Sequence, residues 1–328
     1  MFLINQWKEI FTLTQQRQFE DALKIELKTN QRPVTLNSCT NAIDLALHLC
    51  GVGPGDEVIS TPQTCFASQV GIIHRHARIR WADIDPVTGL MDPETIGELI
   101  TPKTKAIVAV NWGGKFADYG ALKTFGIPVI EDAAHTWDSF LTKDVERGDY
   151  ICYSFQAIKF LTTADGGMLI CPSNKEQDAR ILRWYGLDRT KNESFRCTQN
   201  ITKVGFKYHM NDVIASIGRG NLTHIDNLIL HRKKLISEYN AHGVTAHMWF
   251  AYILSEKRDD LMEFLKMRGI GSGTHHYRND KYTIFGGKQN LPSMDRIEKQ
   301  FLLLPLHHGV SVSDVKNICQ LIHKFNKI

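Results

Sequence analysis

The sequence predicts an α/β protein, with a large domain built on a mostly parallel sheet that helices cover on both faces, followed by a smaller α+β domain. From about residue 34, short apolar runs alternate with amphipathic stretches, a pattern typical of parallel strands joined by helices. The chain has 328 residues, of which 43% are hydrophobic, so it can bury a large core and exceeds the usual size of a single domain. We place the large domain at 1–225 and the small domain at 226–328.

The expected sheet of the large domain has six or seven strands. Each predicted strand is a short apolar run that ends near a polar or turn-forming residue. The runs are 34–37 (VTLN), 57–60 (EVIS), 77–84 (ARIRWADI), 105–111 (KAIVAVN), 127–132 (IPVIED), 150–155 (YICYSF) and 167–170 (GMLI).

Helices are expected at the N-terminus, between the strands and throughout the small domain. Gly51 is the predicted stop of the first inter-strand helix, and Asp92 before Pro93 predicts the cap and first turn of another. The remaining helical patterns are 1–27, 211–240, the run that follows the apolar segment 246–254 and ends at Gly269, and a final amphipathic helix capped at 311–314.

Charge and cysteine usage exclude several classes of function. The 39 basic and 35 acidic residues form no single-sign blocks, so nucleic acid is not an expected partner. Charged residues interrupt the apolar start, which therefore lacks the core of a signal peptide, and no segment is long and apolar enough to span a membrane. Seven cysteines without a CxxC pair predict free thiols in a reducing cytoplasm. The 14 histidines show no metal-ligand spacing, so no metal is expected.

Polar residues that follow strands are the first candidates for a site, because ligands of an open parallel sheet collect at the carboxyl ends of its strands. The segment 38–41 (SCTN) lies between a predicted strand and helix. Free amides at a helix N-terminus, together with the helix dipole, favour a phosphate. Alternatively, Ser38 or Thr40 is an ordinary helix cap.

Charged residues that could take part in catalysis or ligand binding lie at two other strand ends. Asp132 ends one strand and is followed by small residues and His135, so that a flat ligand could lie close and a carboxylate could pair with a protonated ring nitrogen. Asp132 could equally be a helix cap. Lys159 is flanked by Ile158 and Phe160, and apolar surroundings lower a lysine pKa as imine chemistry requires. The alternative is a lysine that extends to solvent.

A phosphate site at a helix terminus, a strand-end aspartate and an apolar-flanked lysine are together the parts that pyridoxal 5'-phosphate requires. The segments that carry them follow one order along the chain. They are NSCTNAIDLALHLCGVGPGDEVIS, ADIDPVTGLMDPETI, ITPKTKAIVAVNWGG, IEDAAH and SFQAIKFLTTADGG. This order resembles the DegT/DnrJ/EryC1/StrS family of sugar aminotransferases over nearly the whole chain from about residue 33.

The resemblance implies a fold type I, pyridoxal-phosphate-dependent aminotransferase that works as a homodimer with its active site at the subunit interface. The implied reaction converts a nucleotide-linked keto-sugar to an amino-sugar for polysaccharide biosynthesis. An amino acid, glutamate, is the expected donor, and ping-pong kinetics follow. Lys159 is the catalytic residue that this resemblance marks, because it would form the Schiff base with the cofactor.

Other residues match the cofactor-binding positions of the family. Asp132 would hold the pyridinium nitrogen protonated, and His135 would lie near the phenolic oxygen. The implied cofactor-binding set is Cys39, Thr40, Cys65, Asp132, His135, Ser154, Lys159 and Asn211.

Within this set, Ser154 and Thr40, with the Cys39 backbone, match phosphate ligands. Asn211, near His209, matches a loop that reaches the phosphate of the partner subunit. Cys65 stands where the family has an aromatic ring that stacks on the cofactor.

Further along, residues 275–278 match a segment that approaches the substrate, although His276 and Tyr277 could instead be packing residues. Dehydratases of the family have histidine in place of the Schiff-base lysine, so Lys159 indicates transamination. The alternative is a pyridoxal-phosphate-binding regulatory or interaction protein with little or no turnover. A nucleotide-binding oxidoreductase is disfavoured because no GxGxxG turn follows the first strand.

Overall fold

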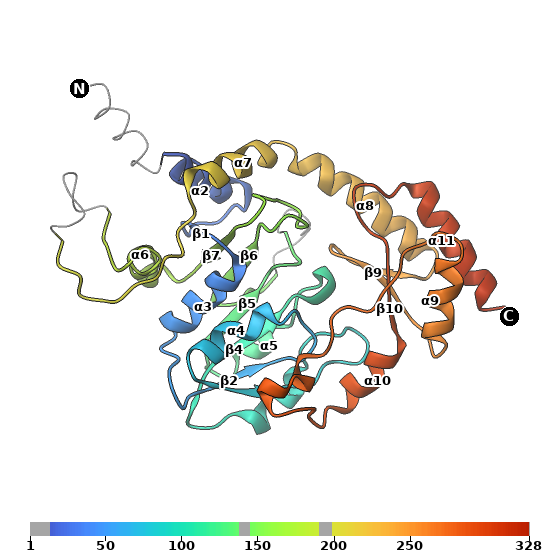
Figure 1. Cartoon of the computed structure of the whole chain (residues 1–328), viewed down its shortest axis with the longest axis horizontal. Helices are drawn as coiled ribbons and strands as arrows, with labels where there is room; N and C mark the ends of the chain where they lie inside the picture. The colour runs from blue at the N-terminus through green and yellow to red at the C-terminus, as the bar shows by residue number, and fades with distance from the viewer. Residues whose placement is uncertain (1–13, 138–144, 190–198, 328) are drawn as a thin grey trace.

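A computed structural model describes residues 14–137, 145–189 and 199–327 of the chain. It contains a seven-stranded sheet and a three-stranded sheet, each with its own helices (Figure 1). The predicted N-terminal helix is present from Thr14 to Glu26 as α2, whereas residues 1–13 and Cys197 lie outside the described residues.

All seven predicted runs contain a strand of the large sheet. The strands are β1 (Val34–Leu36), β2 (Glu57–Ser60), β3 (Arg78–Trp81), β4 (Thr104–Val110), β5 (Val129–Asp132), β6 (Tyr150–Ser154) and β7 (Gly167–Ile170). Their order in the sheet is β1-β7-β6-β5-β4-β2-β3. Neighbours from β3 to β6 pair in parallel, and β7 is antiparallel to both β6 and β1. The prediction of a mostly parallel sheet is therefore confirmed.

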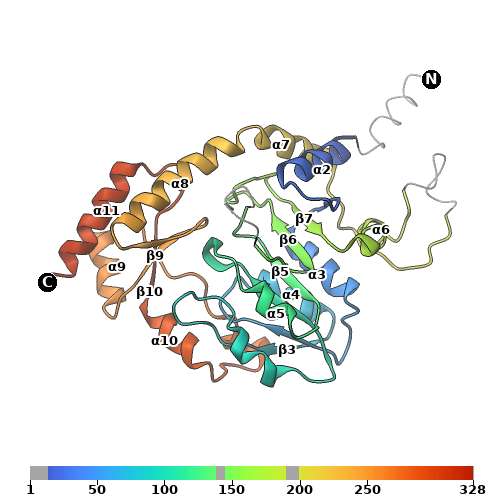
Figure 2. The ribbon, with the colours of Figure 1, turned by 180° about the vertical axis from the view of Figure 1, so that it is seen from behind.

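Helices cover both faces of this sheet because its strands are apolar on both sides. Adjacent residues such as Val108 and Ala109 belong to different core clusters, one under α3 (Cys39–Leu49) and α6 (Ser173–Leu182), the other beside α5 (Tyr119–Lys123). The cluster that contains Phe155 lies under α2 and α7 (Asp212–Leu222). Figures 1 and 2 show these helices on opposite sides of the strands.

Two helix predictions need correction. Asp92 does cap a helical start, but Pro93–Thr95 forms only a single 3-10 turn, followed by a second at Gly97–Leu99, and no α-helix develops in this short, glycine-containing stretch. The predicted helix 211–240 is two helices, α7 and α8 (Ile225–Ala241), because α7 packs on α2 while α8 packs on the small sheet and α11.

The smaller sheet consists of β8 (Thr245–Ala246), β9 (Ala251–Leu254) and β10 (Phe301–Leu304), in the order β10-β9-β8 and antiparallel throughout. Besides α8, the helices α9 (Arg258–Lys266), α10 (Pro292–Gln300) and α11 (Val312–Phe325) accompany this sheet, and α4 (Ala67–His74) belongs to the large part. The capping box predicted for the last helix is present at Ser311 and Asp314. In the described part of the chain, no helix combines the length and apolar character needed to cross a membrane.

An aromatic cluster joins the two sheets. Trp112, just past the end of β4, contacts Phe250 and Phe301, with ring centres 4.8 and 4.6 Å away. The two parts therefore share a core, and residues leading into β9 are brought against the carboxyl end of the large sheet. The domain boundary at residue 225 stays a prediction.

Glu20 fastens α2 to the large sheet through a fully buried carboxylate. It accepts hydrogen bonds from Arg183 at 2.7 Å, Arg180 at 2.8 Å and the Thr35 hydroxyl at 2.9 Å. Burial alone would raise the pKa of Glu20, but the two arginines and the hydrogen bonds lower it to about 2, from 4.5. Folding therefore stabilises the ionised form of Glu20 relative to the unfolded chain.

We expect Glu20→Gln to lower the free energy of unfolding by about 3 kcal/mol at pH 7, since removing one partner leaves buried arginine charge uncompensated. Because the pKa of the folded state is the depressed one, this contribution is complete above about pH 4.5 and is lost as the pH falls toward 2. Urea unfolding of both proteins at several pH values measures this difference. A difference that did not shrink below pH 4.5 would contradict the assignment.

Candidate active site

The residues predicted to bind the cofactor and carry out catalysis come together at the carboxyl ends of β5 and β6. Asp132 ends β5 and Lys159 follows β6 in the turn after Ser154. Burial lowers the pKa of the Lys159 ammonium, and nearby Asp132, Cys39 and Cys65 offset part of that effect. Five of the eight predicted cofactor-binding residues therefore lie in one neighbourhood: Lys159, Asp132, Cys39, Cys65 and His135.

Asp132 is 5% exposed and is held in a fixed orientation. Its Oδ2 accepts a hydrogen bond from Ser68 Oγ at 2.7 Å, and its Oδ1 accepts one from the Ala134 amide at 3.0 Å. The Cys39 thiol lies 4.0 Å from Oδ1. The carboxylate is therefore not a helix cap, as the alternative interpretation had it, but a buried acceptor in the site.

Lys159 is half-buried, and its Nζ forms no hydrogen bond or ion pair with any residue that the structure describes. The ammonium instead lies over the indole of Trp249, 4.3 Å from the ring centre. Such a contact attracts a cation to the ring face without fixing its hydrogens. The alternative of a lysine extended to solvent is therefore wrong, and the amine is available for chemistry.

His135 completes a stack of rings beside Lys159. Its ring is nearly parallel to those of Trp249 and His276, with centres 5.1 and 5.8 Å away. Nδ1 of His135 accepts the Gly113 amide at 3.3 Å, so its Nε2 carries the proton of the neutral ring. Burial, followed by the charge of Lys159, holds the pKa of His135 well below its usual value. The residue is thus a neutral donor at pH 7.

The N-terminus of α3 has the features of an anion site. The Ser38 side chain accepts the Asn41 amide at 3.1 Å, which confirms Ser38, and not Thr40, as the cap. The amides of Cys39 and Thr40 are the first of the helix and have no acceptor within it. Thr40 is half-buried, and its hydroxyl bonds to none of the described residues.

Glycine allows β7 to approach this turn closely. A Cβ on Gly167 would lie 2.3 Å from the Ser38 carbonyl carbon and 2.4 Å from the Cys39 nitrogen. Gly167 pairs with Ser154, so Ser154 lies at the same sheet edge as the turn. Asn211, by contrast, caps its own helix by accepting the Ile214 amide at 3.0 Å, and its predicted contact with a partner subunit stays a prediction.

A buried network supports the loop that carries His135. Glu131, next to Asp132, points away from the site and pairs with Arg147 at 2.8 Å. Asn111 donates to Glu131 at 2.7 Å and accepts the Tyr119 hydroxyl, also at 2.7 Å. Neighbouring carboxylates on β5 thus have different tasks: Glu131 holds the scaffold and Asp132 faces the site.

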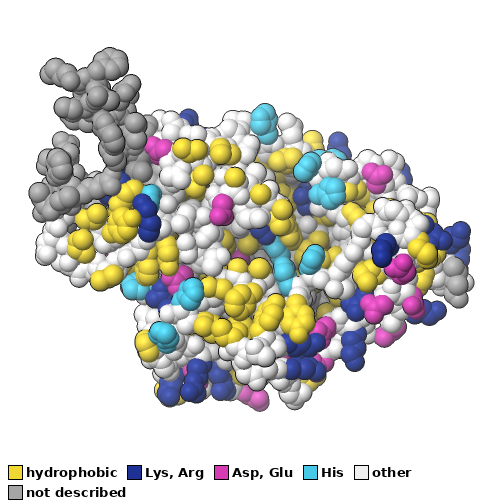
Figure 3. All heavy atoms as spheres, viewed as in Figure 1, with side chains coloured by type: hydrophobic (Ala, Val, Ile, Leu, Met, Phe, Trp, Pro, Cys, Tyr) yellow, Lys and Arg dark blue, Asp and Glu magenta, His cyan; other side chains and the backbone are white. Residues whose placement is uncertain are grey.

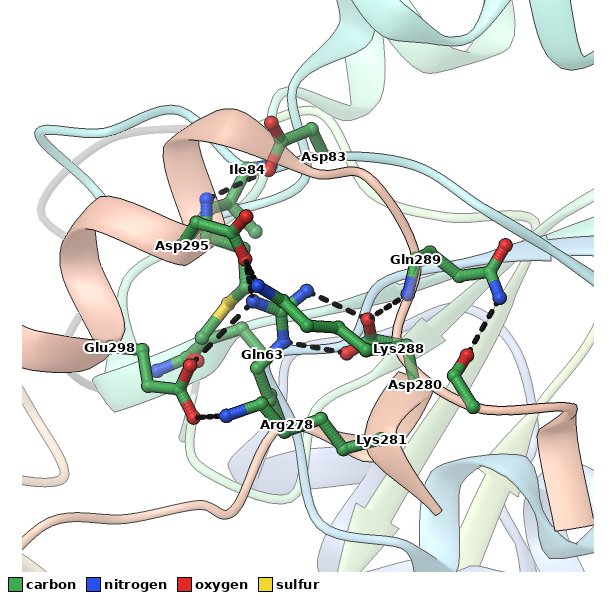
Figure 4. Close-up of polar contacts among 12 residues, drawn as sticks. Gln63, Asp83, Ile84, Arg278, Asp280, Lys281, Lys288, Gln289, Asp295 and Glu298 are labelled. Carbon is green, nitrogen blue, oxygen red and sulfur yellow. Dashed lines mark hydrogen bonds and ion pairs between the residues drawn. The ribbon is translucent and has the colours of Figure 1, made fainter. Parts of the chain in front are cut away.

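Residues 275–278 have different surroundings: some side chains lie at the site, and others hold the segment in place. His276 faces His135, and burial with the nearby His275 and Lys159 lowers its pKa to about 4. Tyr277 is 55% exposed, whereas Arg278 is fully buried and pairs with Asp280 at 2.7 Å (Figure 4). Arg278 therefore anchors the segment instead of facing a substrate. On the face seen in Figure 3, histidine side chains gather around a hollow in the middle of the molecule.

Two contributors to the site were not predicted from sequence. Ser68 lies in the first turn of α4, in the segment after β2, and no role was predicted for it. Trp249 lies 90 positions after Lys159, in the apolar segment 246–254 to which no site role was assigned, and no local pattern marks it. The polar residues in 60–69 could have pointed to Ser68 as a site residue. Trp249 could be identified only once the fold was known.

Comparisons with known proteins match this chain over nearly its whole length. The profile of the DegT/DnrJ/EryC1/StrS aminotransferase family matches residues 5–323. The spore coat polysaccharide biosynthesis protein SpsC of Bacillus subtilis (strain 168) is 31% identical in an alignment 331 positions long, which includes 90% of this chain and 85% of the relative.

Solved structures share the fold over most of their length. The sugar aminotransferase CalS13 from Micromonospora echinospora has a TM-score of 0.86 at 27% identity, covering 95% of this chain and 92% of its own. Spr1654 from Streptococcus pneumoniae in its PLP form has a TM-score of 0.83 at 25% identity, covering 95% and 91% of the two chains.

Proposed function

Because the chain belongs to the DegT/DnrJ/EryC1/StrS aminotransferase family, we propose that it transfers an amino group from glutamate to a keto-sugar linked to a nucleotide diphosphate. The family and the solved structures make it a pyridoxal-phosphate-dependent aminotransferase that acts on sugars. The relative named for polysaccharide biosynthesis supports an activated sugar as acceptor. The observation that carries the proposal is the free amine of Lys159 beside the buried carboxylate of Asp132.

The residues present fit pyridoxal phosphate. The α3 N-terminus with Thr40 and Ser154 would hold its phosphate, Asp132 its ring nitrogen, and His135 Nε2 its phenolic oxygen. When bound, the cofactor supplies an aldehyde for Lys159 and an electron sink for carbon–hydrogen bond cleavage. Cys65 lies near Lys159 but has no aromatic ring with which to stack on the cofactor.

Lys159 has two proposed tasks, to bond the cofactor covalently and to move a proton. The low pKa that burial gives the amine keeps a larger fraction neutral at pH 7, and only the neutral amine is a nucleophile or a base. Its contact with Trp249 leaves the hydrogens and lone pair unrestrained. The released amine would therefore take a proton from the donor's α carbon.

A homodimer in the cytoplasm is part of the proposal. Ile158, one residue before Lys159, is 68% exposed, and Val213 on α7 is 72% exposed. Large apolar side chains at such positions support burial against a second copy, and Asn211 at the start of α7 would then reach the partner's phosphate. Sedimentation of the protein in solution tests the dimer. The cysteines in the described part of the chain are free, which supports a reducing compartment.

An absorbance experiment tests the function. The protein with added pyridoxal phosphate should show a visible band of lysine-bound cofactor, and glutamate should abolish it. A nucleotide-linked keto-sugar should then restore the band, whereas the same sugar without the nucleotide should not. A band that glutamate leaves unchanged would favour the alternative of a regulatory protein, and restoration by the free sugar would overturn the nucleotide requirement.

Gly167→Ala provides a test of the phosphate site. We expect it to weaken pyridoxal phosphate binding about 10-fold, because the added methyl group must displace the Ser38–Cys39 backbone. Gly97→Ala is the matched control, since a Cβ at Gly97 meets nothing within 4 Å. Fluorescence titration with the cofactor measures both variants. Equal dissociation constants for the two variants would show that the turn is not the phosphate site.

A further inference from the structure

Two buried hydroxyls stand behind the carboxylate of Asp132. Ser68 of α4 donates to Asp132 Oδ2 at 2.7 Å, and Thr64 Oγ1 lies 2.7 Å from Ser68 Oγ. The Ser68 side chain is 1% exposed and that of Thr64 is 2% exposed. An ionised carboxylate only accepts hydrogen bonds, so the single Ser68 proton lies toward Asp132 and Thr64 must donate to Ser68. Both hydroxyl dipoles therefore point their positive ends at the carboxylate.

We propose that Ser68 is a positioning residue that keeps Asp132 ionised and aimed at the ring nitrogen of the cofactor, with Thr64 orienting Ser68. This inference rests on the proposed role of Asp132 in cofactor binding and deepens it. A chain of hydroxyls polarised in one direction strengthens the bond at its end.

The carboxylate needs this support because it is almost fully buried. Burial raises the pKa of Asp132, and the Ser68 bond is the first of the opposing influences, ahead of the Ala134 amide and the charge of Lys159. The charge of Lys159 acts on Asp132 only while that nitrogen is protonated, whereas the Ser68 hydroxyl contacts the carboxylate directly and does not titrate. The titratable groups around Asp132 are Lys159, Cys39, Cys152 and Tyr119.

The next residue, Gln69, offers a matched control. It is 0% exposed and lies on the same helix, but its amide donates to the Thr61 carbonyl at 2.7 Å and accepts from Asn279. Gln69 therefore ties α4 to the end of β2 and to the loop after His276, and it does not contact Asp132. Loss of either side chain removes buried hydrogen bonds from α4, but only Ser68 acts on the carboxylate.

The test measures cofactor binding without donor or acceptor, so that it stands apart from the sugar reaction. We expect Ser68→Ala to weaken pyridoxal phosphate binding by about 10- to 100-fold, the usual effect of a hydrogen bond to a charged group. Ser68→Thr should restore binding to within about threefold because it keeps the hydroxyl, and Thr64→Val should give a smaller loss of the same sign. Gln69→Met should bind nearly as the wild type does.

A pH series separates positioning from packing. Without the Ser68 bond, Asp132 takes up a proton at a higher pH, so cofactor affinity in Ser68→Ala should begin to fall about one pH unit higher than in the wild type as the solution is acidified. Wild-type affinity and pH profile in Ser68→Ala would overturn the proposal. So would a loss in Gln69→Met equal to that in Ser68→Ala, because general damage to α4 would then explain both. Absence of sugar turnover in the wild type would overturn the proposed function and leave this result standing.

Discussion

Replacing Lys159 with alanine is expected to lower the rate of amino-group transfer by at least about 1,000-fold, and to remove the visible band of lysine-bound cofactor altogether. The structure offers no substitute amine, because no other lysine contacts Asp132, His135 or Trp249 among the described residues. Steady-state assays with a keto-sugar acceptor and absorbance spectra of the same preparations measure the two effects.

Two further variants separate the tasks of Lys159. Lys159→Arg keeps a positive charge that can lie over Trp249, but a guanidinium does not lose its proton and cannot serve as nucleophile or base. It should therefore be as inactive as the alanine variant while still binding the cofactor. In Lys159→Ala, an added small amine should recover part of the activity by replacing the missing base. Substantial activity in Lys159→Arg would contradict the proposed chemistry.

The large sheet could be predicted from sequence because its strands are buried on both faces. Runs such as KAIVAVN contain almost no polar residue, and each predicted run contains a strand. The same logic identified Asp132 and Lys159, since polar residues that end such runs must lie at one edge of the sheet. Where a helix was predicted at Asp92, the local cap was correct, but only a 3-10 turn follows it.

The remainder of the site depends on contacts between distant segments. Trp249 reaches Lys159 because Trp112 and Phe250 join the two sheets, and neither ring carries a periodic signal of that contact. Ser68 was missed because a serine in the first turn of a helix is usually a cap, whereas here its hydroxyl bonds across to β5. The partners of Arg278 lie up to 20 residues away on α10, so its burial could not be read from local sequence.

Replacing Arg278 with methionine is expected to lower the free energy of unfolding by about 3–5 kcal/mol, the largest stability effect that we predict. Arg278 is completely buried and donates to both oxygens of Asp280, at 2.8 and 2.7 Å, and also to Asp295 (Figure 4). Methionine fills much of the same volume but leaves Asp280 fully buried, with the Gln289 amide as its one remaining donor among the residues that the structure describes. Equilibrium unfolding in urea, with the slope compared between variants, measures the loss.

The double variant Arg278→Met with Asp280→Leu distinguishes charge from packing. If the uncompensated carboxylate causes the loss, removing Asp280 as well should recover most of it, because an apolar pair can replace a buried ion pair at little cost. Lys266→Met, at a pair whose side chains are 75% and 58% exposed, should change stability by less than about 0.5 kcal/mol. A double variant no more stable than Arg278→Met would mean that the shape of the guanidinium, and not its charge, holds the loop.

Since His276 lies two residues before Arg278 and faces His135, the single variant should also raise the KM for the sugar more than the cofactor dissociation constant.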